Sequence, residues 1–245
     1  MKDRLDKIMV ARGLAESRER ASALIMEGKV LVNSMPAAKA GMMINDDAVV
    51  ELKGQDIPYV SRGGLKLEKA LDEFSINVES KTAMDVGAST GGFTDCLLQR
   101  GASKVYAIDV GYGQMDWKLR NDPRVILIER TNIRHIEDAA VPEQVDIAVI
   151  DVSFISLSKV MLRIMDFLKP EAEIVALVKP QFEVGKGEVG KGGIVRDNAK
   201  RLAALEGVKE FCIGLGLEYA GSTESPIAGQ KGNREFLLYL RQSLN

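Results

Sequence analysis

The sequence has few of the residues that usually build metal or redox centres. It contains one histidine, His135, and two cysteines, Cys96 and Cys212, and the cysteines stand in apolar helical patterns without C-x-x-C spacing. A zinc site needs several such ligands at short intervals. We therefore expect no metal site and interpret these three residues as core or surface residues without chemistry.

Long apolar runs are also missing. The runs at 147–150 and 174–178 are far shorter than the roughly 20 residues needed to cross a bilayer, and the charged start MKDRLDKIMVARG lacks the apolar stretch of a signal peptide. We expect a cytoplasmic protein without membrane contact.

The composition, 46% hydrophobic and 28% charged, is ordinary for a globular protein. A length of 245 residues allows one full domain and a small second module.

Residues 1–40 form a basic segment in a chain whose net charge is −2, because they carry eight lysines and arginines against five acidic residues. Apolar residues at helical spacing predict one helix over Leu5 to Leu14 and a second helix that Ser17 caps and Gly28 ends. Alternating residues at 29–33 and 48–52 predict two short strands. This segment is expected to form a compact α+β unit.

The next residues, 53–62, break both periodicities and contain Gly54 and Pro58, as an interdomain linker does. We therefore expect a small domain over 1–58 and a larger domain over 59–245.

From Lys81 onward, strand-like runs alternate with helical ones. The expected strands are 83–86, 104–110, 125–129, 145–153 and 173–179. This alternation predicts a doubly wound, mostly parallel α/β sheet of the Rossmann-like kind. After a helix over 198–215, the runs 217–224 and 235–240 are expected to close the sheet edge as an antiparallel pair.

A glycine-rich loop follows the first of these strands. The run DVGASTGGF occupies residues 85–93 and leads into a predicted helix, where doubly wound sheets bind nucleotide-like ligands. Asp109 ends the second strand, 18 residues past Gly91, where a carboxylate can accept hydrogen bonds from both ribose hydroxyls. The pattern favours a cofactor with an adenosine moiety.

Two features of this loop favour S-adenosylmethionine over a nicotinamide cofactor. Ser89 replaces the second glycine that lets a pyrophosphate approach the backbone. Asp85 would repel a pyrophosphate but complements the ammonium of a methionyl group. The alternative is a tight turn in which the glycines and the acid have only a structural role.

A second glycine-rich stretch, Gly185 to Gly192, nearly matches a phosphate-binding loop, but Gly192 stands where a hydroxyl must hold magnesium. An ATPase is disfavoured. A mobile basic loop that closes over substrate phosphate and a plain surface loop both stay open.

Several stretches together resemble one family: RLDKIMVARGLAESRERA, YVSRGGLKLEKAL, DVGASTGGFTDCLLQRGA, DVGYGQMDWKLRNDPRV, DVSFISL, LVKPQFEVGKGEVGKGGIVRD and GNREFLLYL. From Arg4 to about Leu240 the chain is similar to TlyA-type, haemolysin-like ribosomal RNA 2'-O-methyltransferases. The resemblance implies an S4-like RNA-binding domain followed by an FtsJ-like methyltransferase domain.

By this resemblance, Lys66, Asp151, Lys179 and Glu235 fall at the Lys-Asp-Lys-Glu tetrad of ribose 2'-O-methyltransferases. A ribose hydroxyl must lose its proton as it attacks the sulfonium methyl group, and a neutral lysine can act as the base if burial and a neighbouring cation favour the uncharged amine. Lys66 is expected to supply that cation for Lys179, and the two acids to orient the amines. Alternatively Lys179 stays protonated and only steers the hydroxyl.

The remaining candidate residues fall into two groups. The candidate cofactor contacts are Asp85, Gly87, Ala88, Ser89, Thr90, Gly91, Gly92, Phe93, Asp109, Val110, Asn132 and Asp151, with Asn132 on the adenine side. The candidate RNA contacts in the small domain are Arg4, Arg18, Arg20 and Lys29, for which a solvated basic face is the alternative.

The resemblance also implies a product, 2'-O-methylcytidine. Longer family members modify both ribosomal subunits, whereas members short at both ends modify the large subunit alone. Here three residues precede Arg4 and ten follow Glu235, so we expect large-subunit ribosomal RNA. Naked RNA, a subunit and the whole ribosome stay open as the physical substrate.

Three rival functions are weighed against this one. The first is a membrane-lysing haemolysin, but the sequence lacks a membrane-length segment and a basic amphipathic helix with aromatic residues. A nonenzymatic RNA-binding protein would explain the first 60 residues but not the tetrad. An NAD-dependent oxidoreductase would share with this sequence only the general architecture of the glycine-rich loop.

Overall fold

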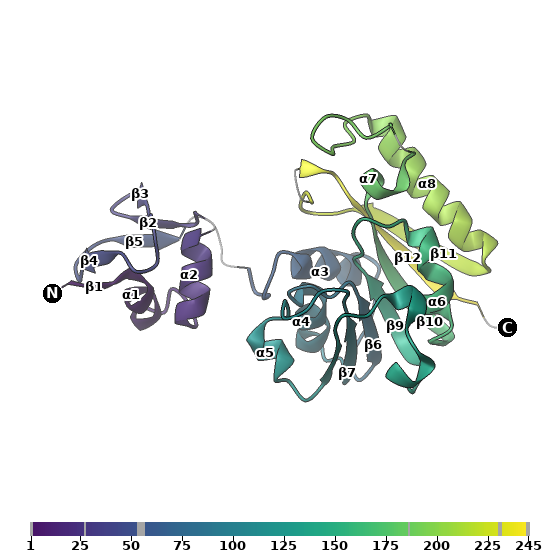
Figure 1. The fold of residues 1–245 in the computed structure, drawn as a ribbon, viewed down its shortest axis with the longest axis horizontal. Helices are drawn as coiled ribbons and strands as arrows, with labels where there is room; N and C mark the ends of the chain where they lie inside the picture. Colours follow the sequence, from purple (N-terminus) through teal and green to yellow (C-terminus); the bar gives the residue numbers. More distant parts are fainter. Residues whose placement is uncertain (1, 27, 53–56, 186, 230–231, 244–245) are drawn as a thin grey trace. The chain divides into compact units, whose positions relative to one another are not determined.

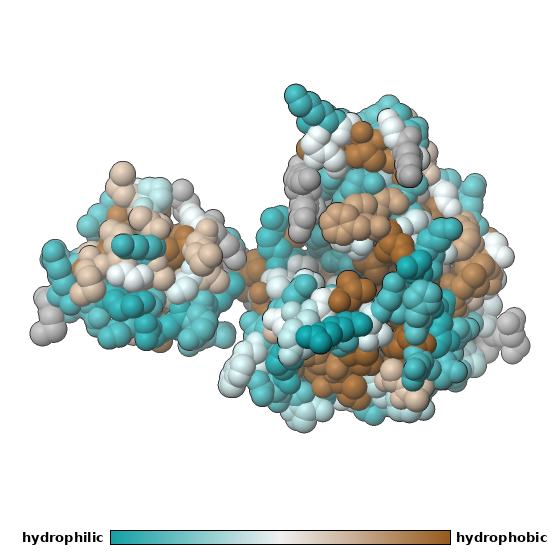
Figure 2. Space-filling view, in the orientation of Figure 1, coloured by the Kyte–Doolittle hydropathy of each residue, from teal (hydrophilic) through white to brown (hydrophobic). Residues whose placement is uncertain are grey.

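A computed structural model describes residues 2–26, 28–52, 57–185, 187–229 and 232–243. The chain divides into two compact units, Met1–Ile57 and Pro58–Asn245 (Figure 1). Hydrophilic residues make up most of the visible surface. On the second unit, apolar residues are also exposed among them (Figure 2). Among the described helices, none is both long and apolar enough to cross a membrane.

The first unit packs two helices on short antiparallel strands. Its elements are β1 (Lys2–Arg4), α1 (Leu5–Ala11), α2 (Arg18–Met26), β2 (Val30–Val32), β3 (Met35–Pro36), β4 (Met43–Asn45) and β5 (Val50–Leu52). Strand β2 pairs with β3 and β5, and β1 pairs with β4. The two predicted strands are β2 and β5, and the sequence did not predict β1, β3 and β4.

The ends of the two helices follow from local chemistry. The Ser17 hydroxyl accepts a hydrogen bond from the Arg20 N–H at 3.1 Å, as a helix cap does. Helix α1 is shorter than predicted, because Gly13 adopts a φ of +69° and turns the chain after Ala11. Leu14 lies beyond that turn but still packs against the core of the first unit.

The second unit is built around a seven-stranded sheet. Its strands are β6 (Thr82–Val86), β7 (Lys104–Ile108), β8 (Val125–Ile128), β9 (Val145–Ile150), β10 (Leu168–Val178), β11 (Leu217–Glu224) and β12 (Phe236–Gln242). Its helices are α3 (Gly63–Glu73), α4 (Gly92–Gln99), α5 (Trp117–Arg120), α6 (Met161–Met165), α7 (Pro180–Glu183) and α8 (Asn198–Gly214). Three short 3-10 helices are η1 (Ile133–His135), η2 (Asp138–Ala140) and η3 (Leu157–Lys159).

The strand order is β11-β12-β10-β9-β6-β7-β8, and β12 runs antiparallel to both of its neighbours. The other pairs are parallel, so the predicted doubly wound, mostly parallel sheet is confirmed. The predicted closing pair at the edge is β11 and β12.

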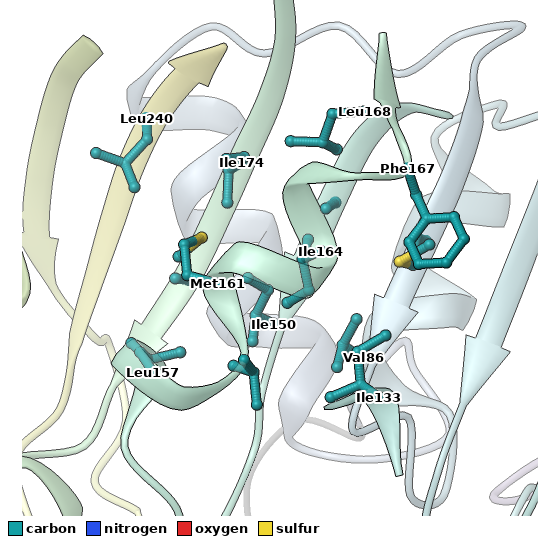
Figure 3. Packing of buried hydrophobic residues seen from close by; sticks show 14 of the residues in the cluster. Val86, Ile133, Ile150, Leu157, Met161, Ile164, Phe167, Leu168, Ile174 and Leu240 are labelled. Carbon is teal, nitrogen blue, oxygen red and sulfur yellow. The ribbon is translucent and has the colours of Figure 1, made fainter. Parts of the chain in front are cut away.

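Helices cover both faces of this sheet because its strands are apolar on both sides. Helices α3 and α4 pack on one face through residues such as Leu67 and Leu97. On the other face, α6 contributes Met161 and Ile164, which pack with Ile150 of β9 (Figure 3).

Several boundaries differ from the sequence predictions, those of β7, β9 and β10 among them. Strands β7 and β9 end earlier than predicted, at Ile108 and Ile150, because the polar residues that follow turn out into loops. Strand β10 begins earlier, at Leu168, and a register irregularity before Glu173 accommodates its polar start. Of the predicted linker, 53–56 lie outside the described residues, and Tyr59 is buried in the core of the second unit.

Candidate active site

A cavity of about 480 Å³ lies at the carboxyl ends of β6, β7 and β9. Its size is typical of a small-molecule site, and this edge of a doubly wound sheet is where such folds bind ligands. It is lined by Val86, Gly87, Ser89, Ile108, Asp109, Val110, Gln114, Thr131, Asn132, Ile133, Arg134, Asp151, Val152, Ser153, Phe154, Ile155 and Val160.

The loop between β6 and α4 needs glycine at two positions for different reasons. Gly87 has a φ of +88°, and a Cβ there would lie 2.5 Å from the Asp151 carbonyl oxygen. Gly91 has a φ of +94°, and its Cβ would meet the Met115 sulfur at 2.6 Å. The first glycine lets the loop approach the end of β9, and the second starts helix α4.

Asp109 is held rigidly between two loops at the cavity wall. Its carboxylate accepts hydrogen bonds from the backbone N–H of Ser89 at 2.7 Å and of Gly111 at 2.6 Å. Each carboxylate oxygen keeps a second acceptor site. The side chain can therefore still accept hydrogen bonds from a diol placed in the cavity.

Half of the candidate cofactor residues do not line this cavity. Asp85, Ala88, Thr90, Gly91, Gly92 and Phe93 are absent from its wall. Of these, Ala88 and Phe93 are buried in the core beneath the loop, whereas Thr90 is exposed. Gly87, Ser89, Asp109, Val110, Asn132 and Asp151 do line it.

Asp85 corrects a specific expectation. Its side chain has no exposed surface, so in this arrangement it cannot contact the ammonium of a methionyl group directly. The Thr94 hydroxyl donates to Asp85 Oδ2 at 2.7 Å, while Oδ1 is buried without a hydrogen-bond partner. Burial raises the pKa of Asp85 to about 7 despite the Thr94 hydrogen bond, and the nearby Asp151 carboxylate adds to the rise.

The adenine-side candidates lie in the loops after β7 and β8. The Asn132 side-chain oxygen caps η1 by accepting from the Arg134 N–H at 3.1 Å. Val110 is largely exposed beside it in the cavity wall. Sequence reasoning missed Gln114 and Ser153 as cavity residues, although Ser153 stands in the DVSF run directly after Asp151.

Sheet register brings three of the four tetrad positions to neighbouring strand ends. Val178 of β10 pairs with Phe236 of β12, so Lys179 and Glu235 each lie one residue beyond that pair. Asp151 directly follows Ile150, which pairs with Ala176 on the other side of β10. Lys66 lies on α3 and reaches the same edge through Glu235.

The four residues form two ion pairs, in which Lys66, Lys179 and Glu235 are buried and Asp151 is partly exposed. Lys66 Nζ donates to Glu235 Oε2 at 2.6 Å. Lys179 Nζ lies 2.5 Å from Asp151 Oδ1, in a contact without hydrogen-bond geometry, and donates to the Ser153 hydroxyl at 2.8 Å. Each ammonium is therefore balanced by its own carboxylate, which is the arrangement that buried charges require.

Glu235 depends on a glycine that faces it. A Cβ at Gly229 would lie 1.9 Å from Glu235 Oε1. The Ser225 backbone N–H also donates to the Glu235 carbonyl oxygen at 2.9 Å. These contacts hold the start of β12, and thereby the carboxylate, against Lys66.

In the first unit, the candidate RNA contacts divide into two pairs. Arg4 and Arg18 converge on the buried Asp6, each with a guanidinium nitrogen 2.9 Å from Asp6 Oδ2. The hydrogen bond from Arg4, with a smaller contribution from Arg18, holds the pKa of Asp6 well below its usual range. Arg20 lies on α2, and Lys29 precedes β2.

The second glycine-rich stretch does not form a phosphate-binding loop of the ATPase kind. It follows α7, whereas that motif requires a strand-to-helix turn. The residues that follow the stretch are held in place, because Asn233 donates to the Gly193 carbonyl oxygen at 2.8 Å and accepts from the Val195 N–H at 3.1 Å. They are thereby tied to the segment that carries Glu235.

Comparison with known families assigns both units. The FtsJ-like methyltransferase model matches residues 59–242, and the S4 domain model matches residues 3–50. The chain is thus a methyltransferase of the FtsJ-like class joined to an S4 domain.

Individual relatives narrow this class. The 16S/23S rRNA (cytidine-2'-O)-methyltransferase TlyA of Mycobacterium tuberculosis is 46% identical over 97% of this chain and 89% of its own length. The 23S rRNA (cytidine-2'-O)-methyltransferase TlyA of Campylobacter jejuni is 33% identical over 94% and 96%. A solved structure from Streptococcus thermophilus, whose name refers to a hemolysin, is 44% identical with a TM-score of 0.78 over 99% of this chain and 89% of that one. The chain therefore belongs to the TlyA family.

Proposed function

We propose that this protein transfers a methyl group from S-adenosylmethionine to the ribose 2'-hydroxyl of a cytidine in large-subunit ribosomal RNA. The observation that carries the proposal is the pair of buried lysine–carboxylate contacts, Lys66–Glu235 and Lys179–Asp151, at the edge of the sheet where the cavity opens. Asp151 connects the cavity with the ion pairs, because it lines the cavity and also contacts Lys179.

The cavity wall fits the cofactor in chemistry as well as in size. Asp109 offers acceptors for a ribose diol, Val110 and Ile133 offer apolar surface for an adenine ring, and Gly87 leaves room beside the Asp151 backbone. Asp151 supplies a carboxylate at the same wall for the methionyl ammonium. When bound, S-adenosylmethionine supplies an electrophilic methyl group.

Lys179 is the residue proposed to act on the acceptor hydroxyl. It is almost fully buried, and Asp151 and Ser153 fix the direction of its amine. In the charged form it orients the hydroxyl oxygen by donating a hydrogen bond. In the neutral form it accepts the proton that the hydroxyl loses. Lys66 and Glu235 hold the neighbouring strand end in place and keep the local charge balanced.

The division of labour between the units is also part of the proposal. We assign RNA binding to residues 1–58, through Arg4, Arg18, Arg20 and Lys29, and catalysis to residues 59–245. The S4 match and the half-exposed guanidinium groups of Arg4 and Arg18 support this assignment. Phosphate contacts of this kind position RNA without reading its bases.

The names of the relatives support cytidine in large-subunit ribosomal RNA as the proposed substrate. Both TlyA relatives are described as cytidine-2'-O-methyltransferases, and large-subunit 23S RNA is the substrate that their two descriptions share. Such a substrate agrees with the cytoplasmic location expected from the sequence.

The test uses unmodified large and small ribosomal subunits, incubated separately with the enzyme and labelled S-adenosylmethionine. Digestion of the RNA should release labelled 2'-O-methylcytidine from the large subunit. Label on a base, or only in the small subunit, would contradict the proposal. Lysis of red cells by the purified protein in the absence of cofactor and RNA would instead favour the haemolysin alternative.

A further inference from the structure

One acidic residue outside the tetrad connects the cofactor cavity with the element that carries Lys179. Glu183 is the last residue of α7, and its half-buried side chain faces the loop that follows β9. Its Oε2 accepts a hydrogen bond from the Ser156 hydroxyl at 2.6 Å, and its Oε1 accepts one from the Leu157 backbone N–H at 2.9 Å. Both carboxylate oxygens are thus used to hold a single loop.

This loop, residues 151–160, forms one wall of the cavity. It contributes Asp151, Val152, Ser153, Phe154, Ile155 and Val160 to the lining. Its first residues, Asp151 and Ser153, also contact Lys179. Any displacement of the loop would therefore change the cofactor cavity and the surroundings of Lys179 together.

The loop also contains a strained backbone position, because Phe154 has a φ of +65°. L-residues rarely adopt this conformation, and it persists only where surrounding contacts hold it. The ring of Phe154 lies 5.2 Å from that of Phe182, the α7 residue next to Glu183. On the far side, Leu157 is buried in the core (Figure 3). Helix α7 and the core thus hold the loop from two sides.

We propose that Glu183 is a positioning residue, which fixes the 151–160 loop against α7 and sets both the cofactor wall and the direction of the Lys179 amine. Helix α7 begins directly after Lys179, so the same short element fixes the lysine at one end and the loop at the other. Burial also raises the pKa of Glu183, as expected for a carboxyl group packed between two elements. This inference rests on the proposed use of S-adenosylmethionine.

The central experiment replaces Glu183 by leucine, which keeps similar volume but offers no acceptor to Ser156 and Leu157. Calorimetry with S-adenosylmethionine should show affinity reduced about tenfold, and steady-state assays should show KM for the cofactor raised and kcat lowered, with KM for RNA unchanged. Glu183→Gln should rescue affinity to within about threefold, because its carbonyl oxygen can accept from Leu157 and its amide can donate to the Ser156 oxygen.

A second variant and a matched control complete the design. Ser156→Ala removes the hydrogen bond to Glu183 together with the contacts that the Ser156 hydroxyl makes with Ser158, and it should weaken cofactor binding about threefold. Glu210→Leu makes the same exchange as the central variant at an exposed position of α8 and should leave binding unchanged. A residue with only a structural role would lower Tm without changing KM in the folded fraction.

Three results separate the possible failures. Folded Glu183→Leu that binds S-adenosylmethionine within twofold of wild type would overturn the inference and leave the proposed function intact. If that variant does not fold, unchanged affinity in Ser156→Ala would overturn it instead. Wild-type protein that fails to bind S-adenosylmethionine would refute the proposed function itself.

Discussion

The two units arrange their charges in opposite ways. In the first unit the acid is hidden, since the Asp6 side chain is 3% exposed, while its partners Arg4 and Arg18 are 44% and 49% exposed. In the second unit the cations are hidden, since the Lys66 and Lys179 side chains are each 10% exposed. A buried acid presents two cations to solvent in one case, and carboxylates hold buried amines in the other.

This difference separates two tasks. Arginines held by a buried carboxylate keep N–H donors that face outward in a fixed direction, and such donors suit a phosphate backbone. We expect their proposed interaction with RNA to be sensitive to salt because solvent screens it. Buried amines are screened far less, so small changes of geometry around them have large consequences for a proton transfer. We expect the first unit to contribute affinity and the second to contribute rate.

The largest effect should come from Lys179→Ala. Loss of the amine that faces the acceptor should reduce kcat by about a thousandfold, a loss of the order expected for general acid–base groups. Cofactor affinity should stay within about threefold, because Lys179 does not line the cavity. Single-turnover methyl transfer together with calorimetry would measure both. As a control, Lys209→Ala on α8 should have no effect, and residual turnover within tenfold of wild type would contradict the proposed role.

The two buried aspartates should respond to pH in opposite directions. Asp85 has a folded-state pKa raised to about 7, so its contribution to stability is fully present below its unfolded value and is lost as pH rises through about 7. Relative to Asp85→Asn, the wild type should therefore lose roughly 3 kcal/mol of unfolding free energy between about pH 4 and pH 7. Denaturant unfolding at a series of pH values would measure the difference, and parallel curves for the two proteins would refute it.

Asp6 provides the opposite case for the same measurement. Its pKa is lowered by the arginines, so its contribution is present above the unfolded value and is lost as pH falls toward the folded one. The stability difference between wild type and Asp6→Asn should shrink below about pH 4. If both variants shifted in the same direction, the contrast between the two units would fail.

A smaller effect is expected for Arg18→Ala combined with Arg20→Ala. The double variant should bind ribosomal RNA about tenfold more weakly, and the slope of log affinity against log salt should fall by roughly 1.5 if each arginine neutralises one phosphate. Arg4 stays as a partner for Asp6 in this variant. Arg124→Ala, at an ion pair of the second unit, should change neither quantity. An unchanged slope would place the RNA contacts elsewhere.

The smallest effect should come from Asp109→Ala. We expect cofactor affinity to fall about fivefold to tenfold, because the diol acceptors and the Ser89 and Gly111 contacts are lost together. Asp122→Ala provides a partly buried control outside the cavity. Calorimetry that shows unchanged binding in Asp109→Ala would exclude it as a ribose contact.

Periodicity predicted the sheet because its strands are buried runs between helices, and it placed Lys179 and Glu235 at strand ends that the register now brings together. It could not predict that Asp85 faces inward, because an acid at the end of a strand has the same sequence signature on either side. The partnership of Lys66 and Glu235 spans 169 positions and leaves no local trace. The proposed role of Glu183 could not be predicted from the sequence for a similar reason, since it depends on a loop 26 positions away.

The place of β12 in the sheet bears on how the enzyme is made. This strand lies between β10 and β11 and directly follows Glu235, yet it comes after every other described strand in the sequence. Proteins emerge from the N-terminus at about 5–20 residues per second, so the cavity-lining residues up to Val160 are available several seconds before the partner of Lys66 exists. Products of termination between codons 180 and 235 therefore carry the cavity-lining residues and Lys179 but lack Glu235, the partner of Lys66. Both proposed ion pairs can form only in a chain that is translated beyond Glu235.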